Sequence, residues 1–353
     1  MKGWLSFHPV DTGFFDDTIG PLVAGGKINP EGFVAEAVRL RKVAWQARRF
    51  TRALETALSA AAPPEPDRGT DLWTRIRWTL DRFDFRPEEV SRLASRCVEP
   101  DLHLFGRPFL VTESSAAKVA ETVERYVSAA SADDVESLAR EQLARLDPEL
   151  GKHLVPEDGP DPSPDLMHRS DLLADLTAIR DLAEAARRGM PWSKGEAAGK
   201  PAAEVLREEG ALRAVRLHAR IVPFWLARDV DGLDTICRAA GISPPESLVP
   251  ARRILPGPCE EFPGFGESLG VEISRPNQVG AFVAPEDVPD LLGLLADAGA
   301  RIIGVAARQG EGPACTALLR KIRECATYAA RRGFGYLEAS GILPPDLSEA
   351  GQA

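Results

Sequence analysis

The spacing of apolar residues at the start of the chain predicts a short strand followed by a long helix. Residues 3–7 form an aromatic run that ends at His8-Pro9, which is typical of a strand terminated by proline. Asn29-Pro30-Glu31 then supplies a capping side chain, a first-turn proline and an acidic residue at the positive end of the helix dipole. Apolar residues keep helical spacing from Phe33 to the Pro63-Pro64 pair, so we expect the longest helix of the chain there.

Helical spacing also dominates the rest of the chain. Further helices are predicted at 14–23, 73–83, 87–97, 114–128, from 131 onward, 171–188, 204–222, 233–240, 287–298 and 313–332. Short strands are predicted at 109–111, 280–284, 301–307 and 335–339. The segment 244–263 contains six prolines, too many for a core element, and is expected to be a loop. The pattern indicates a helix-rich α+β protein whose short strands form one or two small sheets.

Two parts of the chain echo each other. Phe109-Leu110-Val111-Thr112 before a predicted helix has a counterpart in Ala281-Phe282-Val283-Ala284, and Ala-Ala-Arg-Arg-Gly closes later helices at 185–189 and 329–333. A strand-helix unit used twice explains the echo, and so does common helix-ending chemistry that arises twice by chance. On the first interpretation the chain has a mainly helical region with a leading strand and two strand-helix units, the second with the proline-rich loop at 244–263. These regions are 1–104, 105–200 and 201–353.

Length and composition narrow the class of protein. A chain of 353 residues exceeds what one hydrophobic core serves, so two or three packed units are expected. With 44% hydrophobic and 27% charged residues, the composition excludes a disordered or fibrous protein. No segment approaches the roughly 20 apolar residues that span a bilayer, and the apolar run at the N-terminus is too short for a signal peptide. Five cysteines without a CxxC pair favour reduced thiols, so we expect a cytoplasmic protein, and the composition suggests a bacterial source.

Charge argues against a polyanionic partner, with one local exception. The 53 acidic and 43 basic residues give a net charge of -10, whereas nonspecific nucleic-acid binding needs Lys and Arg to neutralise phosphates. The exception is the segment 39–52 of the long helix, where basic residues are interleaved with Trp45 and Phe50 and are suited to an acidic partner or phosphates. Its basic residues are Arg39, Arg41, Lys42, Arg48, Arg49 and Arg52. Solvated side chains that cover the core are the alternative interpretation.

Polar residues that follow the first strand form the best candidate for chemistry. His8, Asp11, Asp16 and Asp17 lie close together in sequence, and imidazole and carboxylate groups suit a divalent metal or a substrate proton. Arg48 or Arg49 would then hold an anionic group of the substrate. In the alternative interpretation, His8 ends the strand, Asp11 caps the next turn and the two aspartates are solvated. The candidate binding residues are therefore His8, Asp11, Asp16, Arg48 and Arg49.

Two glycine-rich motifs have simpler explanations. Gly266-Glu267-Ser268-Leu269-Gly270 matches the nucleophile elbow of hydrolases, but that fold needs a histidine after the serine, and the last histidine here is His218. Gly310-Glu311-Gly312 resembles a turn that holds a phosphate with backbone amides. It lacks the third glycine of the dinucleotide fingerprint and the Lys-Ser/Thr of a P-loop, and a flexible turn explains it equally well.

The sequence favours a noncatalytic interaction or accessory protein, because no recognisable catalytic constellation is present. Its expected partner is another protein rather than a membrane or nucleic acid, and neither a metal nor a cofactor is assigned. One alternative is an enzyme that acts on a small anionic substrate or uses a divalent metal near His8 and Asp11. The other is a binder of an acidic partner or nucleic acid through the basic segment 39–52.

Overall fold

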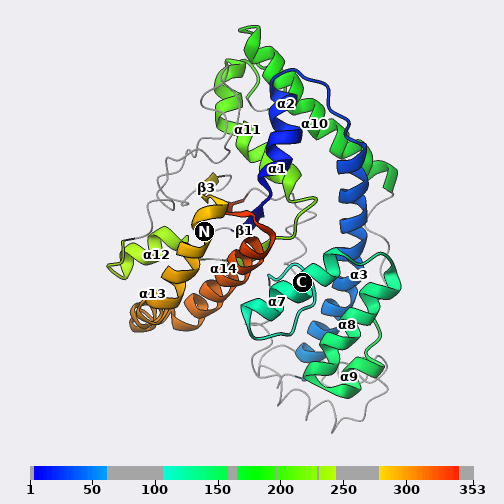
Figure 1. Ribbon diagram of the computed structural model, residues 1–353, viewed down its shortest axis with the longest axis vertical. Helices are drawn as coiled ribbons and strands as arrows, with labels where there is room; N and C mark the ends of the chain where they lie inside the picture. The colour runs from blue at the N-terminus through cyan, green and yellow to red at the C-terminus, as the bar shows by residue number, and fades with distance from the viewer. Residues whose placement is uncertain are drawn as a thin grey trace, which may run out of the picture. The chain divides into compact units, whose positions relative to one another are not determined.

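The computed structural model describes residues 4–61, 106–157, 165–195, 197–228, 230–243 and 278–341 (Figure 1). The chain divides into two compact units, one formed by 1–40 and 164–348 and the other by 41–163 and 349–353. The division falls within the long helix α3 (Glu31–Ala61), which begins and ends where the capping sequence and the helical spacing predict. No helix in the described ranges combines the length and the apolar character that crossing a membrane requires.

The first unit is built around one sheet whose pairs are all antiparallel. Its strands are β1 (Trp4–Val10), β2 (Trp225–Arg228), β3 (Gln278–Val283) and β4 (Gly335–Ser340), in the order β2-β1-β4-β3. Its helical segments are α1 (Thr12–Phe14), the π-helix η1 (Phe15–Ile19), α2 (Gly20–Val23), α10 (Asp165–Arg187), α11 (Ala202–His218), α12 (Leu233–Ala239), the 3-10 turn η3 (Pro285–Asp287), α13 (Val288–Arg308) and α14 (Gly312–Arg332). The helix-rich α+β class predicted from the sequence is confirmed.

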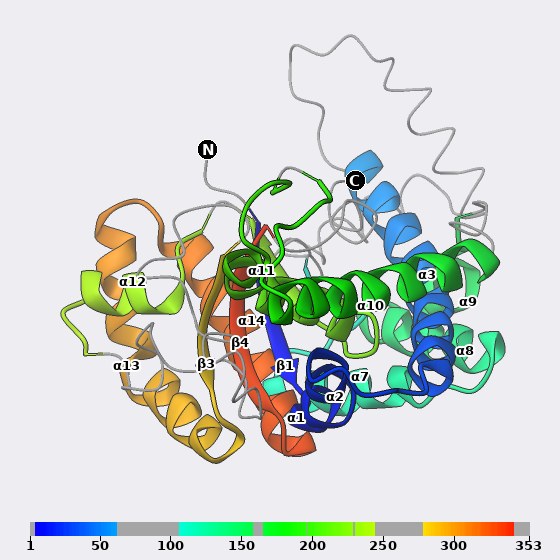
Figure 2. The ribbon, with the colours of Figure 1, turned by 90° about the horizontal axis from the view of Figure 1, so that it is seen from above.

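Helices cover both faces of this sheet, as Figure 2 shows for β1, β4 and β3. On one face Val10 and Leu337 join a core cluster with apolar residues of α2, α10 and α11. On the other face the ring of Trp225 lies 5.9 Å from that of Tyr328 on α14. β1 is buried from Leu5 to Val10 without a break, so its polar side chains must find their hydrogen-bond partners inside the protein.

β1 extends further than the sequence predicts. The strand runs through His8 and Pro9 to Val10 instead of ending there. β2 pairs with β1 only from Trp4 to Phe7, whereas β4 pairs with it as far as Val10. At Pro9 the strand therefore has a described neighbour on one side only, and proline is tolerated at such an edge because it needs to donate no ladder hydrogen bond there.

Two other predicted strands are wrong. Residues 301–307 belong to α13, where Ile302 is buried and Val305 is partly exposed, as on one side of a helix. Residues 109–111 are buried but belong to no strand of the described chain, and the Leu110 carbonyl accepts a hydrogen bond from the Tyr126 hydroxyl. The counterpart of 109–111 in the echo does form β3. The strand half of the first predicted unit is therefore absent, while duplication of the chain stays a prediction.

The shared helix endings behave as predicted. Gly189 and Gly333 follow α10 and α14 with φ values of 63° and 67°. This left-handed conformation is strained for other residues and common for a glycine that closes a helix. The predicted helices at 73–83 and 87–97, the whole loop at 244–263 and the Gly266–Gly270 motif lie outside the described residues.

In the described part of the second unit, helices α8 (Ala132–Leu146) and α9 (Pro148–His153) pack against the C-terminal part of α3, and α7 (Ala116–Val127) packs against α8. Phe50 and Leu54 of α3 form a core with Leu110, which lies before α7, and with Leu143 of α8 and Leu150 of α9. Ser131 and Asp134 form a reciprocal capping box at the start of α8, where the sequence predicts that a helix begins.

Close packing in the sheet makes Gly335 sensitive to substitution. A Cβ atom at this position lies 2.4 Å from the Phe282 ring and 2.7 Å from the Val283 carbonyl oxygen. We expect Gly335→Ala to lower the free energy of unfolding by about 1 to 3 kcal/mol through overpacking. Denaturant titration measures this, with Gly293→Ala as control, because a Cβ there meets nothing within 4 Å. Equal stability of the two variants contradicts the packing described for β3 and β4.

Candidate functional site

His8 lies in the core, and its hydrogen bonds define its protonation state. Its exposed fraction is 1%, and burial lowers the pKa of its imidazole to about 3. The Ser6 hydroxyl donates to the Ala339 carbonyl at 3.1 Å, so it has no second proton for His8 Nε2, which lies 2.8 Å from Ser6 Oγ. The His8 Nε2–H group must therefore donate to Ser6, and Nδ1 carries the lone pair.

His218 joins this site from the last turn of α11. The backbone amide of Asp11 donates to His218 Nε2 at 3.1 Å, so the proton of this neutral ring is on Nδ1. Burial, and then the nearby His8, lower the pKa of His218 to about 3. The Phe14 and Phe15 rings pack against the imidazole at 5.5 and 5.2 Å between ring centroids. Sequence reasoning missed this residue, because its partner Asp11 lies 207 positions away.

The aspartates beside the histidines have different surroundings. Asp11 Oδ1 accepts the Gly13 amide at 3.0 Å and caps α1, as the alternative interpretation of the sequence expects. Asp16 and Asp17 are exposed on the π-helix η1. Partial desolvation, and then the Asp17 carboxylate, raise the pKa of Asp16. No group of three or more His, Cys, Asp or Glu residues in the described ranges is arranged to hold a metal ion.

The burial of His8 and His218 determines what chemistry is possible at the C-terminal end of β1. An imidazole with a pKa near 3 is a weak general base at neutral pH, because efficient proton transfer needs a pKa near the working pH. Neutral rings remain good hydrogen-bond partners, and here both rings bond to neighbouring groups of the core. The end of β1 is therefore well suited to join β1, α1 and α11, which are distant in sequence.

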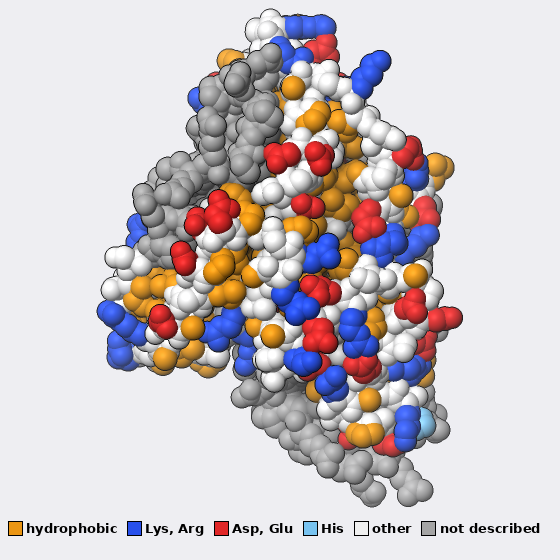
Figure 3. Space-filling view, in the orientation of Figure 1, with side chains coloured by type: hydrophobic (Ala, Val, Ile, Leu, Met, Phe, Trp, Pro, Cys, Tyr) orange, Lys and Arg blue, Asp and Glu red, His pale blue; other side chains and the backbone are white. Residues whose placement is uncertain are grey.

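Arg48 and Arg49 belong to the second compact unit, whereas His8, Asp11 and Asp16 belong to the first. Both arginines are partly buried. Arg49 Nε donates to the Glu157 carbonyl at 2.7 Å, and its guanidinium lies 5.1 Å from the centre of the Trp45 ring. On the first unit's part of α3, Arg39 pairs with Glu36 at 2.6 Å. Basic side chains of this segment thus pack and pair within the chain, and the face drawn in Figure 3 mixes both signs of charge.

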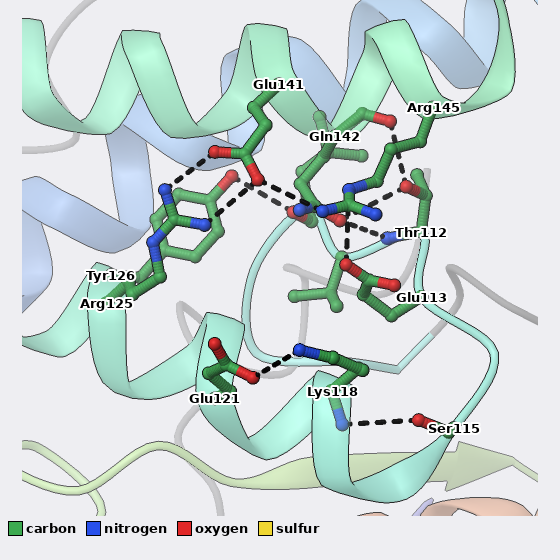
Figure 4. Close-up of polar contacts among 12 residues, drawn as sticks. Thr112, Glu113, Ser115, Lys118, Glu121, Arg125, Tyr126, Glu141, Gln142 and Arg145 are labelled. Carbon is green, nitrogen blue, oxygen red and sulfur yellow. Dashed lines mark hydrogen bonds and ion pairs between the residues drawn. The ribbon is translucent and has the colours of Figure 1, made fainter.

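A polar network connects α7, α8 and the segment before α7 in the second unit (Figure 4). Glu141 accepts two hydrogen bonds from Arg125, at 3.0 and 2.6 Å, and one from Arg145. The bond to Arg125 is the main cause that lowers the pKa of Glu141 to about 2. Thr112 bonds through its amide and hydroxyl to Gln142, at 2.9 and 3.1 Å. Because these groups bind one another across three segments, the network holds the helices together.

The glycine-rich turn at Gly310-Glu311-Gly312 does not present its amides to an anion. It joins α13 to α14 rather than a strand to a helix. The Gly310 amide donates to the Ala307 carbonyl at 3.1 Å, and the Glu311 amide donates to the Ala306 carbonyl at 2.9 Å. The end of α13 thus uses the Gly310 and Glu311 amides, which favours the simple turn over the phosphate-binding alternative.

Glu338 is a fully buried acid on the other face of the sheet. The Tyr336 hydroxyl donates to Glu338 Oε1 at 2.9 Å, and the backbone amide of Leu233 donates to Oε2 at 3.1 Å. Burial outweighs both hydrogen bonds and raises the pKa of Glu338 to about 7. This carboxyl therefore connects β4 to the first residue of α12 and exchanges its proton near neutral pH.

Helix α10 carries apolar residues on two opposite sides. Leu172, Leu176 and Ile179 are buried in the core of the first unit. On the other side, the exposed fractions of Leu166, Met167 and Leu173 are 78%, 59% and 36%. At 100° per residue these three lie in one stripe with three small exposed residues. We call this set the α10 stripe, which consists of Leu166, Met167, Ser170, Leu173, Ala174 and Thr177.

No protein-family model matches this chain, and comparison with curated proteins and with solved structures finds no match either.

The buried histidines make stability fall in acid. An unfolded histidine binds a proton below about pH 6.5, whereas His218 in the folded chain stays neutral to about pH 3. The unfolded state therefore takes up more protons, and stability falls as pH decreases from 6.5. We expect denaturant titration between pH 7.5 and 5 to show a loss that is roughly 2 kcal/mol larger in the wild type than in His218→Gln. His153→Gln, at a surface histidine, should lose as much as the wild type, and the same loss in all three proteins contradicts the assignment.

Glu338 has the opposite effect on stability. Its pKa rises from 4.5 to about 7 on folding, so its contribution is fully present below pH 4.5 and is lost as pH increases through 7. We expect the stability difference between Glu338→Gln and the wild type to shift in favour of the variant by roughly 3 kcal/mol over this interval. Denaturant titrations at pH 4.5 and 8 measure the shift. Glu286→Gln, at an exposed acid, is the control, and a shift as small as that of the control argues against a buried neutral carboxyl.

Proposed function

We propose that this chain is a noncatalytic interaction protein that binds another protein through the α10 stripe. The observation that carries the proposal is the exposure of Leu166, Met167 and Leu173 on a helix whose opposite side is already buried. A helix in contact with one core needs one apolar side, and a second apolar side costs solubility unless a partner covers it. Leu166 and Leu173 are seven positions apart, the spacing at which an amphipathic partner helix makes contact.

Charge around the stripe indicates the chemistry of the partner. At 100° per residue, Asp165 and Asp171 lie on opposite sides of Leu166, and Asp171 is exposed. The neighbouring Arg169 pairs with Glu31 at 2.8 Å, which offsets its charge. The whole chain carries a net charge of -10. A partner helix with leucine-like residues on one side and Lys or Arg beside them complements this surface.

Synthetic helical peptides test the proposal with the full chain. One peptide carries leucines on one side flanked by lysines, and a second has glutamates in place of the lysines. In fluorescence anisotropy we expect the lysine peptide to bind about tenfold more tightly than the glutamate peptide. Leu166→Ser with Leu173→Ser should weaken that binding by about tenfold or more. Met190→Ser, at an exposed apolar residue outside the stripe, should bind like the wild type.

Two results would contradict the proposal that a different protein binds the α10 stripe. If the leucine double variant binds the lysine peptide as the wild type does, the stripe is not the binding surface. If sedimentation shows a dimer that the same variant makes monomeric, a second copy of the chain covers the stripe, and the proposal of a different partner fails.

Each of the two alternative functions, an enzyme or a nucleic-acid binder, has a separate test. An enzyme at His8 and Asp11 should be stabilised by a divalent cation or by a small anionic ligand, which thermal unfolding detects. A nucleic-acid binder acting through 39–52 should bind at low salt and lose affinity steeply as salt is added. A protein that responds to neither leaves the interaction proposal as the one to pursue.

A further inference from the structure

Two of the three methionines of the chain are exposed, and one of them belongs to the α10 stripe. Met167 of the stripe is 59% exposed, and Met190, shortly after the end of α10, is 50% exposed. Met1 lies outside the described residues. An exposed thioether is readily oxidised by peroxides, which converts an apolar side chain into a polar one. The other members of the stripe carry aliphatic or hydroxyl side chains without sulfur, and they are Leu166, Ser170, Leu173, Ala174 and Thr177.

The neighbours of Met167 on α10 leave its side chain open to solvent. Residues three and seven positions further along a helix share one side with the first residue. For Met167 these are Ser170 and Ala174, which are both exposed and too short to cover a thioether. A partner helix that contacts Leu166 and Leu173 therefore also contacts Met167, and in the free protein an oxidant reaches it.

The described cysteines are protected from the same oxidant. Cys237, Cys315 and Cys325 are buried, and burial is the largest of the causes that raise the pKa of each thiol. Peroxides react with the thiolate, which these groups do not form at neutral pH. Among the sulfur groups in the described part of the chain, the exposed methionines therefore react first.

We propose that oxidation of Met167 to its sulfoxide by a peroxide weakens binding of the partner helix to the α10 stripe. This inference rests on the proposed function of the stripe. A lone pair of the sulfur forms a bond to one peroxide oxygen, the O–O bond breaks, and the other oxygen leaves as water. The sulfur loses the two electrons that the peroxide gains. The new sulfoxide oxygen bonds to water in the free protein and loses those bonds when leucines of the partner cover it.

The test uses the full chain and the lysine peptide described above. The protein is treated with hydrogen peroxide and then with dithiothreitol, which reduces oxidised thiols and leaves sulfoxides in place, and mass spectrometry measures oxidation at Met167 and Met190. We expect the oxidised wild type to bind the peptide about tenfold more weakly in fluorescence anisotropy. Methionine sulfoxide reductase, with dithiothreitol as the reductant, should restore the affinity.

Two leucine variants locate the effect. Met167→Leu keeps an apolar side chain of similar volume without an oxidisable sulfur, so its affinity should stay within about twofold of the untreated wild type before and after peroxide. Met190→Leu is the matched control and should lose affinity on oxidation as the wild type does. A saturating amount of the lysine peptide should slow oxidation of Met167 by about fivefold or more and leave that of Met190 unchanged.

The outcomes separate this inference from the proposed function. If the untreated wild type does not bind the lysine peptide, the proposed function is refuted and this inference falls with it. If binding persists after complete oxidation of Met167, this inference alone is refuted and the stripe remains a binding surface. An equal loss of affinity in oxidised Met167→Leu assigns the effect to another residue and also overturns the inference.

Discussion

Burial of the inner strands on both faces of the sheet is the constraint on which the first unit depends. In a strand with one solvent-exposed face, polar side chains on that face can form hydrogen bonds with water. β1 and β4 have helices on both sides of the sheet and lack such a face. Ser6 and His8 on one face and Tyr336 and Glu338 on the other must therefore bond inside the protein. These bonds connect the sheet to α11 and α12, because Asp11 at the end of β1 bonds to His218 and Glu338 bonds to the start of α12.

The same constraint explains why His8, His218 and Glu338, whose side chains are the types that most often act in catalysis, are buried and hydrogen-bonded within the core. Burial lowers the pKa of His8 and His218, which stay neutral at pH 7, and raises that of Glu338 to about 7, so each shift is toward the neutral form. The interaction that we propose lies elsewhere, on the outer side of α10. The α10 stripe combines exposed apolar side chains with a neighbouring carboxylate, that of Asp171. The physical basis of the proposed interaction is apolar contact reinforced by attraction for a cationic group.

Local rules predicted the helices and the fold class well, because their signals lie within a few residues. The Asn29-Pro30-Glu31 start of α3, the helix start at Ser131 and the glycines after α10 and α14 are examples. The runs 109–111 and 301–307 were wrongly predicted as strands, since a short apolar run suits a strand, a helix or a buried segment equally well. Length settles the second case, because residues 301–307 are the last part of the 21-residue helix α13.

Contacts between residues far apart in the chain could not be predicted from the sequence. His218 is 207 positions from Asp11, and Glu338 is 105 positions from Leu233. Glu338 and Glu286 look alike in the sequence, yet one is buried and the other is exposed. The outer apolar side of α10 was also missed, because leucines at 166, 172, 173 and 176 fit one helical pattern and do not reveal which of them face the core.

The most direct test of the buried, neutral core is nuclear magnetic resonance of the histidine side-chain nitrogens in the intact chain. The proton of His8 should lie on Nε2 and that of His218 on Nδ1, and both sets of shifts should stay constant from pH 8 to pH 5. A titration of either ring near pH 6.5, or the opposite tautomers, contradicts the arrangement of hydrogen bonds on which the first unit depends.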